Sequence, residues 1–426
     1  MSSLFITNGR VIDPASKKDA KLNVLIKDGK IADVTSSKNV CEDAQIIDVK
    51  DCIVAPGFID MHVHLRDPGQ EYKEDIKTGT AAAAAGGFTS ICCMPNTDPV
   101  NDCASVTDYI LDRASKTGST NVFPVGAITR GLKGQALADI GDMAKAGVCA
   151  ISDDGKSVAN ASVLRRAMEY AIAFGLPVIS HCEDPALSAN GMMNEGNVSL
   201  ELGLAGIPAA AEESMVARDI LLAELTGAPL HIAHVSTEGS VRIIQEAKGR
   251  GVKVTAEVTP HHLTLTEDAV VDYDPNTKVN PPLRTDGDKR ALIKALADGT
   301  IDAIATDHAP HNIIDKEAGF EEACFGLIGL ETMLPLMLAL VNERKLTLKR
   351  LIEALTSAPA KILSLKGKGT LAKGADADIT IFDTTSSWTI QSSRFASKSR
   401  NTPFDGLRVV GKPRYTIVGG KVVYSG

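Results

Sequence analysis

Sequence features that direct a chain to a membrane or out of the cell are missing here. Residues 1–13 have no basic flank followed by an apolar core, so a secretory signal is not indicated. The longest uncharged stretch, residues 78–97, is about long enough to span a bilayer, but Gly86, Gly87 and Pro95 interrupt it. It is typical of a helix end followed by a buried strand. We therefore expect a cytoplasmic protein with no membrane partner.

Basic runs and paired cysteine motifs are missing as well. The formal charge of −8 is spread along the chain, without a basic run that could release counterions from a phosphate backbone. Nucleic acid is therefore not an expected partner. None of the eight cysteines belongs to a CxxC pair, and the neighbours of Cys92 and Cys93 are apolar. We expect reduced, buried thiols.

The two ends of the chain carry short β signals. Hairpin dipeptides occur at Asn8-Gly9, Asp28-Gly29 and Gly419-Gly420, and residues 376–382 alternate in the manner of a strand. These signals predict one small β module, a β-sandwich built from residues 1–55 and 366–426, which would bring the termini together.

Residues 56–365 repeat a different pattern, in which a short apolar run precedes a longer segment of helical period. The strand-length runs lie near residues 58–63, 89–94, 121–127, 149–152, 177–181, 230–234, 253–258 and 303–306. One helix follows the fourth run, with Asn160 as N-cap and Gly175 as its C-terminal stop. Eight such units favour an α/β fold of the (β/α)8 TIM-like barrel type, with an open doubly wound sheet as the alternative.

Histidine and aspartate residues gather at the ends of these apolar runs. The residues are His62, His64, Asp153, Asp154, His181, His234, Asp307 and His308. A barrel enzyme places its chemistry where strands end and loops begin, so this clustering favours the barrel over the open sheet.

The spacing His62-x-His64 predicts a metal site, because alternate residues of a strand point the same way and both imidazoles can reach one ion. His181 and His234, from neighbouring strands, can hold a second ion, and Asp154 can bridge the two pairs. Four imidazoles with carboxylates suit Zn²⁺ better than Mg²⁺ or Ca²⁺. Mn²⁺, Co²⁺ and Fe²⁺ stay open as alternatives.

Asp307 follows an apolar strand inside the polar cluster 305–311. We predict that it binds the ion, takes the proton of the attacking hydroxide and passes it to the leaving nitrogen, against the alternative of a loop-capping aspartate. Lys156 could bridge two metals only after carboxylation, and we interpret it as a solvated loop lysine. A structural role is also preferred for His231, which has no clear partner, and for the pair His261 and His262, which could support the metal ligands from behind.

At these positions the sequence resembles the dihydroorotases of the amidohydrolase superfamily. The resemblance begins with Gly-Phe-Ile-Asp-Met-His-Val-His-Leu-Arg-Asp-Pro-Gly at 57–69. It continues with Met-Pro-Asn-Thr at 94–97, Glu-Val-Thr-Pro-His-His-Leu at 257–263, Val-Asn-Pro-Pro-Leu-Arg at 279–284, Thr-Asp-His-Ala-Pro-His at 306–311 and Phe-Gly at 325–326. It implies a reversible hydrolase of pyrimidine biosynthesis that interconverts N-carbamoyl-L-aspartate and L-dihydroorotate by hydroxide attack on the ring amide.

The resemblance also implies roles for particular residues. One metal would be held by His62, His64 and Asp307 and the other by His181 and His234, with one or two Zn²⁺ ions per chain and two favoured. The substrate contacts would be His64, Arg66, Asn96, Asn280, His311 and the backbone of Phe325 and Gly326. Arg66, Asn96 and His311 would hold the substrate carboxylate, which the planar fork of an arginine matches bidentately.

The fourth strand departs from many relatives, which bridge their metals there with a carboxylated lysine. Here the strand ends Ile-Ser-Asp-Asp-Gly at 151–155, which resembles a bacterial subgroup that uses aspartate. The shorter side chain leaves the metal number open, including a site with one tightly and one weakly bound ion.

Two other functions compete with this one. An allantoinase or hydantoinase would share the barrel and the paired histidines, but Arg66 argues against a ring without a carboxylate. A noncatalytic subunit of an aspartate carbamoyltransferase complex would have lost metal ligands, whereas every expected ligand position is filled here. We expect a homodimer, with aspartate carbamoyltransferase as a further partner, although the sequence identifies no interface.

Overall fold

The eight apolar runs form one parallel sheet in the computed structural model, which describes residues 3–37 and 44–426. Its strand order is β17-β16-β15-β12-β11-β10-β9-β8. The strands are β8 (Phe58–Val63), β9 (Phe88–Cys93), β10 (Asn121–Gly126), β11 (Ala150–Ser152), β12 (Val178–Ser180), β15 (Leu230–Ile232), β16 (Val254–Val258) and β17 (Ala303–Ile304). Val63 forms a parallel bridge to His308, just beyond β17, so the sheet closes on itself. The predicted barrel is confirmed, and the open sheet is excluded.

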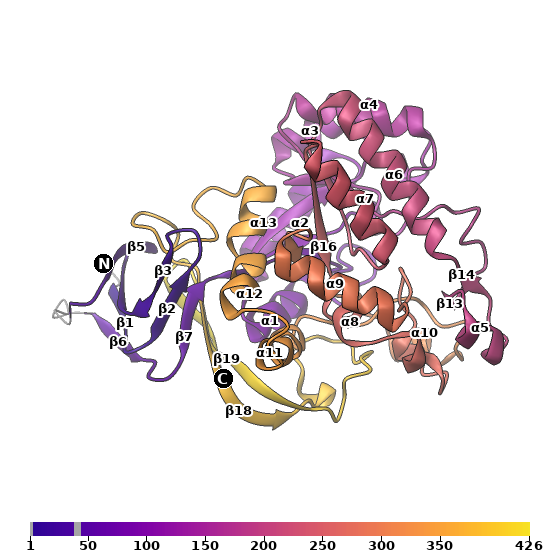
Figure 1. Ribbon diagram of the computed structural model, residues 1–426. Helices are drawn as coiled ribbons and strands as arrows, with labels where there is room; N and C mark the ends of the chain where they lie inside the picture. Colours follow the sequence, from indigo (N-terminus) through magenta and orange to yellow (C-terminus); the bar gives the residue numbers. More distant parts are fainter. Residues whose placement is uncertain (1–2, 38–43) are drawn as a thin grey trace.

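Helices alternate with these strands and cover the outside of the barrel (Figure 1). They are α1 (Ile76–Gly86), α2 (Ala104–Thr117), α3 (Ile140–Ala146), α4 (Ala161–Ile172), α6 (Ala209–Thr226), α7 (Glu238–Gly249), α9 (Asp286–Asp298), α11 (Met333–Asn342), α12 (Leu348–Leu355) and α13 (Ser357–Ile362). Asn160 caps α4 as predicted, since its side chain accepts hydrogen bonds from the backbone of Ser162 and Val163. Gly175 has φ +66° in the turn that follows α4.

The uncharged stretch 78–97 is divided between α1 and β9, which confirms its interpretation as helix followed by strand. Among the residues that the structure describes, no helix is both long enough and apolar enough to cross a membrane.

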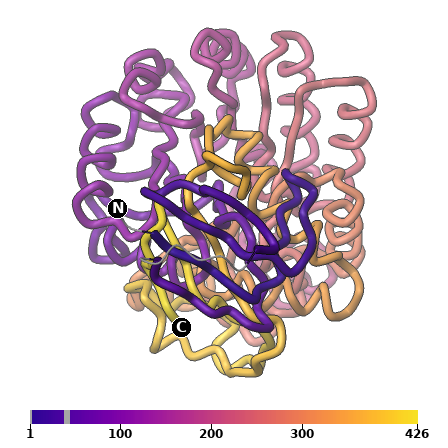
Figure 2. The backbone as a smooth tube through the Cα atoms, turned by 90° about the vertical axis from the view of Figure 1, so that its left-hand side faces the viewer, coloured from indigo at the N-terminus to yellow at the C-terminus, as the bar shows by residue number. Residues whose placement is uncertain are grey.

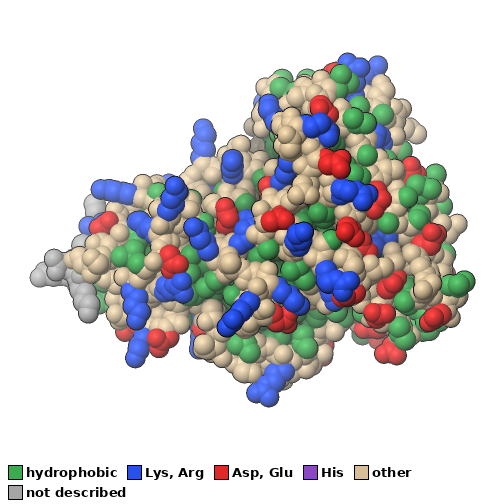
Figure 3. All heavy atoms as spheres, in the orientation of Figure 1, with side chains coloured by type: hydrophobic (Ala, Val, Ile, Leu, Met, Phe, Trp, Pro, Cys, Tyr) green, Lys and Arg blue, Asp and Glu red, His purple; other side chains and the backbone are tan. Residues whose placement is uncertain are grey.

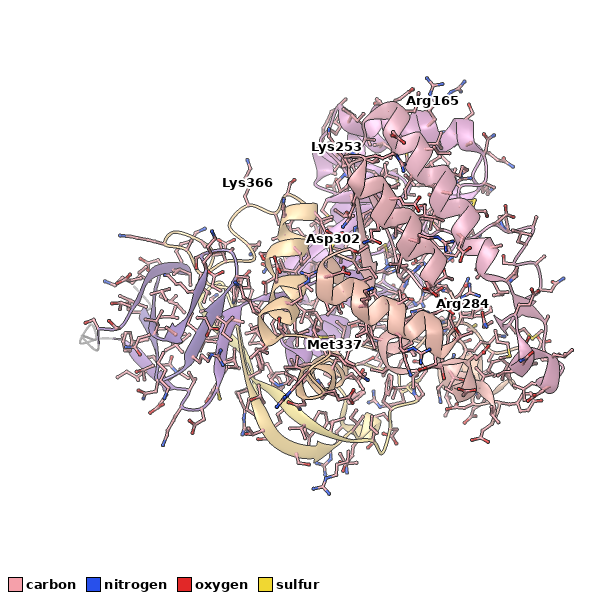
Figure 4. The ribbon with its side chains drawn as sticks, viewed as in Figure 1. Arg165, Lys253, Arg284, Asp302, Met337 and Lys366 are labelled. Carbon is pink, nitrogen blue, oxygen red and sulfur yellow. The ribbon has the colours of Figure 1, made fainter. Side chains whose placement is uncertain are left out.

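Excursions of the chain project from the mouth of the barrel, the end where its strands finish. They contain β13 (Met193–Asn194), α5 (Asn197–Leu202), β14 (Gly206–Ile207), α8 (Pro260–Thr264) and α10 (Ile313–Glu317). Buried Arg284, just before α9, ties the segment with β13 and β14 to the barrel. It donates to Asn194 Oδ1 at 2.8 Å and to the Ile207 carbonyl at 2.6 Å. Figure 4 labels Arg284 on this side, and Lys253 and Asp302 at the opposite end, where β16 and β17 begin.

The chain termini build two further sheets. A four-stranded sheet has the order β5-β4-β1-β6, and a six-stranded sheet has the order β20-β19-β18-β7-β2-β3. The strands are β1 (Ser3–Thr7), β2 (Arg10–Asp13), β3 (Lys18–Lys21), β4 (Asn23–Lys27), β5 (Lys30–Thr35), β6 (Gln45–Asp48), β7 (Ile53–Pro56), β18 (Ile379–Thr389), β19 (Arg408–Val418) and β20 (Lys421–Ser425). Figure 2 shows N-terminal and C-terminal strands side by side.

The two sheets share one apolar core, to which Ile6 and Val24 contribute from the first sheet and Val54 and Ile381 from the second. This packing confirms a small β-sandwich from both chain ends. The domain boundaries themselves, residues 1–55 with 366–426 and residues 56–365, stay a prediction.

One of the three predicted hairpins is wrong. Asp28-Gly29 joins paired strands β4 and β5, and Gly419-Gly420 joins β19 and β20, as predicted. Asn8-Gly9 instead carries the chain from one sheet to the other, because β1 pairs with β4 and β6 whereas β2 pairs with β3 and β7. A Cβ atom on Gly9 would lie 2.6 Å from Val54 Cγ2, so close packing between the layers requires glycine here.

The sandwich packs against the end of the barrel where the strands begin. Thr380 of β18 accepts from the Phe58 amide at 3.0 Å and donates to the Gly87 carbonyl at 2.6 Å. The rings of Phe58 and Phe382 lie 5.7 Å apart. The sandwich therefore stabilises one end of the barrel and leaves the other end free for a site.

Seven of the eight cysteines lie in the described residues, where all seven are free thiols; Cys41 lies outside them. Burial was predicted for all of them, and it holds for Cys92, Cys93 and Cys182. The prediction is wrong for Cys52, Cys103, Cys149 and Cys324, which are partly exposed.

Candidate metal centre and substrate site

Six side chains converge where the barrel strands end. They are His62 and His64 from β8, Asp154 after β11, His181 after β12, His234 after β15 and Asp307 after β17. None of them is more than 9% exposed. On the face drawn in Figure 3, charged side chains of both signs are scattered over the surface and no histidine is visible.

Asp154 is shared by two groups of candidate metal ligands. His62, His64 and Asp154 form the first group, and Asp154, His181 and His234 form the second, with the ligand atoms of each group within 4.8 Å of one another. Asp154 Oδ1 lies 3.1 Å from His62 Nε2 and 3.7 Å from His234 Nε2. One carboxylate between two pairs of imidazoles is the arrangement of a bridged pair of ions.

Two ligand atoms at the centre of this cluster are left without a hydrogen bond. His62 Nε2 and Asp154 Oδ1 are buried and have no hydrogen-bond partner within residues 3–37 and 44–426. Buried polar atoms are almost always paired, so unpaired atoms that face each other indicate a ligand between them. The imidazole and carboxylate donors fit a borderline cation such as a first-row divalent metal.

The electrostatics of the cluster keep its two carboxylates ionised. Burial alone would raise the pKa of Asp307, but the charges of His62 and His64 lower it far below its ordinary value. Burial would also raise the pKa of Asp154, but the charge of His62 outweighs burial and the pKa is lowered strongly. Both carboxylates are therefore ionised at neutral pH, as metal ligands must be.

The backbone is strained at the mouth of the barrel. His234, Asp307 and Arg66 have φ angles of 33°, 47° and 60°, in the left-handed region that residues other than glycine rarely adopt. Such conformations cost about 1–3 kcal/mol each and occur preferentially at functional sites. Here they aim three site side chains toward one volume.

The three bridge candidates separate clearly. Asp154 faces the histidines, whereas Asp153 accepts hydrogen bonds from the amides of Ile128 and Thr129, at 2.8 and 2.9 Å. Lys156 is exposed, in accord with its interpretation as a solvated loop lysine. The structure thus places the predicted bridge inside the cluster and the other two residues outside it.

Glu257 was missed by the sequence reasoning. It is fully buried at the end of β16, with Oε1 2.9 Å from His62 Nδ1 and Oε2 3.1 Å from His231 Nε2. The absence of a partner for His231 was therefore a wrong expectation, although its structural role agrees with the contact. Burial would raise the pKa of Glu257, but hydrogen bonds from His231 and His62 lower it to about 2. The sequence did offer a signal for Glu257, because it is a charged residue near the end of the apolar run 253–258.

The other two unassigned histidines differ from each other. His262 is held on both ring nitrogens, by Thr259 Oγ1 at 2.7 Å and the Pro281 carbonyl at 3.0 Å. His261 Nε2 is buried and has no hydrogen bond among the described residues.

The predicted carboxylate contacts Arg66 and His311 lie together beside the metal cluster. Arg66 Nη2 is 3.4 Å from His311 Nε2, and Arg66 Nε donates to the Pro310 carbonyl at 3.2 Å. Burial and the neighbouring Arg66 lower the pKa of His311 to about 2, so its ring is neutral. Asn96 Oδ1 accepts from His64 Nδ1 at 2.8 Å, which leaves its amide nitrogen as the group that can donate to a carboxylate.

The predicted ring contacts are already partly occupied. The Phe325 carbonyl lies 2.8 Å from His311 Nε2, and the Gly326 amide donates to the Lys278 carbonyl at 2.8 Å. Asn280 Oδ1, by contrast, is buried and without a partner in the described part of the chain. Asn280 Oδ1 is therefore a free acceptor, whereas the Phe325 carbonyl and the Gly326 amide already have partners.

Comparisons with known proteins agree with this geometry. Residues 51–240 match the Dihydro-orotase-like family, and residues 290–424 match the Amidohydrolase family. A dihydroorotase from Geobacter metallireducens is 56% identical over 423 residues, which span 99% of this chain and 100% of that protein. One from Geotalea daltonii is 54% identical over 423 residues, which span 99% of both chains.

Solved structures with the same fold include a hydantoinase and a dihydropyrimidinase. An L-hydantoinase (dihydropyrimidinase) from Arthrobacter aurescens has a TM-score of 0.90 and 28% identity, covering 100% of this chain and 96% of that one. A dihydropyrimidinase from Brevibacillus agri has a TM-score of 0.86 and 25% identity, covering 99% of this chain and 95% of that one.

A parallel barrel with paired histidines on its first strand and a carboxylate shared between two ligand groups defines an amidohydrolase, a class of hydrolase that includes enzymes acting on cyclic amides. Within that class, the sequence identity to dihydroorotases over almost the whole chain decides the family. The chain belongs to the dihydroorotase family. This confirms the resemblance drawn from the sequence motifs.

Proposed function

We propose that this chain interconverts N-carbamoyl-L-aspartate and L-dihydroorotate in pyrimidine biosynthesis, with Zn²⁺ as its metal. The observation that carries the proposal is the position of Arg66 and His311, a buried pair 3.4 Å apart beside the Asp154 cluster. A cationic fork next to a metal centre suits a ring amide that carries a carboxylate.

Two ions would share this centre. His62, His64 and Asp307 would hold one, His181 and His234 the other, and Asp154 would lie between them. The metal centre supplies Lewis-acid chemistry, which activates water and polarises the amide carbonyl. The orphaned His62 Nε2 and Asp154 Oδ1 support this assignment within the described residues.

Asp307 moves the proton in this scheme. Ionised and within reach of the cluster, it accepts a proton from the attacking water as the new C–O bond forms. It then gives that proton to the ring nitrogen as the C–N bond breaks, and cyclisation follows the same steps in reverse. Its Oδ1 lies 3.2 Å from His64 Nε2, so the carboxylate faces the proposed metal centre.

Substrate binding falls to the residues around the metal centre. Arg66, His311 and the Asn96 amide would hold the carboxylate, and Asn280 Oδ1 would accept a ring N–H. His64 would touch both the metal and the substrate, because its Nε2 faces Asp307 and its Nδ1 faces Asn96. Phe325 and Gly326 would close the site beside the ring.

A hydantoinase or dihydropyrimidinase is the second candidate, since solved relatives with those activities share the fold. The decisive test measures hydrolysis of L-dihydroorotate, dihydrouracil, hydantoin and allantoin by the purified chain, together with its metal content. We expect dihydroorotate to be preferred and about two zinc ions per chain at saturation. Arg66→Met should remove that preference without lowering metal content. A wild-type preference for dihydrouracil would refute the proposal.

Assembly and location form a separate part of the proposal. A homodimer, a complex with aspartate carbamoyltransferase and a cytoplasmic location are each consistent with the family. Light scattering on the purified chain should give the mass of a dimer, and the mass of a single chain would refute this part of the proposal.

A further inference from the structure

The segment between β18 and β19 returns from the sandwich to the mouth of the barrel. Half-buried Glu331 accepts hydrogen bonds from the amides of Ala396 and Ser397, at 3.1 and 3.2 Å. Buried Glu74 accepts from the Ser397 hydroxyl and from the Lys398 amide. The chain is thus fixed immediately before Asn401, far in sequence from the barrel strands.

Asn401 is the residue at which this segment meets the candidate substrate site. It is 4% exposed, and its Oδ1 accepts from the His311 amide at 3.1 Å. Its Nδ2 donates to the carbonyls of Ala309 and Gly326, at 3.0 and 3.2 Å. Its own carbonyl accepts from the Ile328 amide at 2.9 Å. The side chain therefore uses its donor and acceptor atoms on two loops that follow β17.

Both carboxylate contacts depend on the loop that Asn401 holds. His311 belongs to it, and Arg66 rests on it through the Pro310 carbonyl, which lies between the two positions bonded to Asn401. The Gly326 carbonyl is held from the other side by Lys316, whose buried Nζ donates to it at 2.9 Å. His311 and Asn401 also line one cavity of about 850 Å³.

We propose that Asn401 is a positioning residue for substrate binding: together with the hydrogen bond from the Ala309 amide to the Leu327 carbonyl, it holds the loop that carries His311 against the loop that carries Gly326, and thereby supports the geometry of the carboxylate pocket. The assignment of the pocket rests on the proposed function, but the coupling of the two loops does not. Because Asn401 touches none of the metal ligands in the described structure, its effect should fall on substrate affinity.

Three variants separate this role from a general loss of stability. Asn401→Ala removes all side-chain bonds to both loops. Asn401→Asp has nearly the same shape, keeps the acceptor for the His311 amide and loses the donor to Ala309 and Gly326. Thr402→Ala is the matched control, because it removes a buried hydroxyl whose bond to the Phe404 amide stays within the segment.

The first measurement is amide hydrogen exchange in peptides that span residues 309–311 and 325–328 of the full chain. Asn401→Ala should raise exchange in both peptides, with the His311 amide as the direct reporter, and Thr402→Ala should change neither. This readout does not depend on catalysis, so it decides the coupling even if the wild type fails to hydrolyse dihydroorotate and the proposed function is lost.

The second measurement is steady-state kinetics with dihydroorotate and inhibition by orotate, a planar ring with the same carboxylate. Both Asn401 variants should raise KM and the orotate inhibition constant by roughly 10-fold or more, since loss of a buried partner leaves polar groups unpaired. kcat should change by less than about 3-fold, and zinc content should match the wild type. Unchanged KM and inhibition constants in folded Asn401→Ala and Asn401→Asp, or a fall in kcat alone, would overturn the assignment.

Discussion

His62 Nδ1 lies 2.9 Å from Glu257 Oε1, and both side chains are fully buried. This contact fixes the tautomer of His62, because the nitrogen that donates to the carboxylate leaves Nε2 as the atom that faces Asp154. The second carboxylate oxygen is held by His231, so the glutamate cannot rotate away. The orientation of the His62 ring on β8 is thus fixed by His231 on β15 and Glu257 on β16.

Glu257→Gln should weaken zinc binding while leaving the barrel folded. An amide has one acceptor oxygen instead of two, so it cannot accept from both histidines, and loss of such a supporting contact typically costs roughly 10- to 100-fold in metal affinity. Competition with a chromophoric chelator gives the dissociation constant directly. Thr255→Val, which removes the 2.8 Å contact to His231 Nδ1 and a 3.5 Å bond to the Leu230 carbonyl, is the milder control. Equal zinc affinity in Glu257→Gln and the wild type would contradict this role.

Asp307→Asn should lower kcat by roughly 10²- to 10⁴-fold, since an amide cannot accept the proton of the attacking water. The fold should persist, because the amide fills the same volume. Stopped assays in both directions, with circular dichroism as the control for folding, test this expectation. A variant with near-normal kcat would assign the proton transfer to another residue.

The bridge can be tested by three alanine variants of neighbouring residues. Asp154→Ala should lose metal and activity strongly, because its carboxylate lies in both ligand groups. Asp153→Ala should lose less, since its carboxylate holds the backbone at 128–129, and exposed Lys156 should tolerate alanine. Metal analysis and kcat are measured on all three. Loss of metal in Lys156→Ala with an active Asp154→Ala would instead point to a carboxylated lysine.

His262 should make the protein less stable in mild acid. Burial lowers its pKa to about 4 in the native state, while the unfolded residue has the ordinary value near 6.5. Below about pH 6.5 the unfolded state therefore binds the extra proton, and the free energy of unfolding falls by up to roughly 1.4 kcal/mol per pH unit down to about pH 4. Urea unfolding of wild type and His262→Gln across this range should give a shallower slope for the variant. Parallel slopes would mean that His262 is protonated when native.

Much of the barrel could be predicted from the sequence, because its signals are local. Parallel strands buried on both faces appear as short apolar runs, and each of the eight predicted runs overlaps a strand. The six proposed ligands follow from the same logic, since strand ends of a barrel meet at one mouth and the residues found there are buried together. Their chemical roles rest on the proposed function.

The remaining features depend on contacts between distant segments. Asn8-Gly9 has the composition of a hairpin, and only the pairing of β1 with β4 and β6 shows that it links two layers. His231 looked unpartnered because Glu257 lies on another strand. Asn401 sits in a polar stretch without periodicity, and its role appears only when the chain returns to the barrel mouth.

The six-stranded sheet sets an order of events during synthesis on the ribosome. β7 pairs with β2 on one side and with β18 on the other, and the whole barrel is encoded between β7 and β18. The early strands thus emerge with an open hydrogen-bonding edge that only the last part of the chain can cover. Unpaired edges of this kind favour aggregation in partly made chains. A chain that ends before β18 would carry the barrel sequence attached to an unfinished sheet. Such a truncated chain should be insoluble rather than partially active.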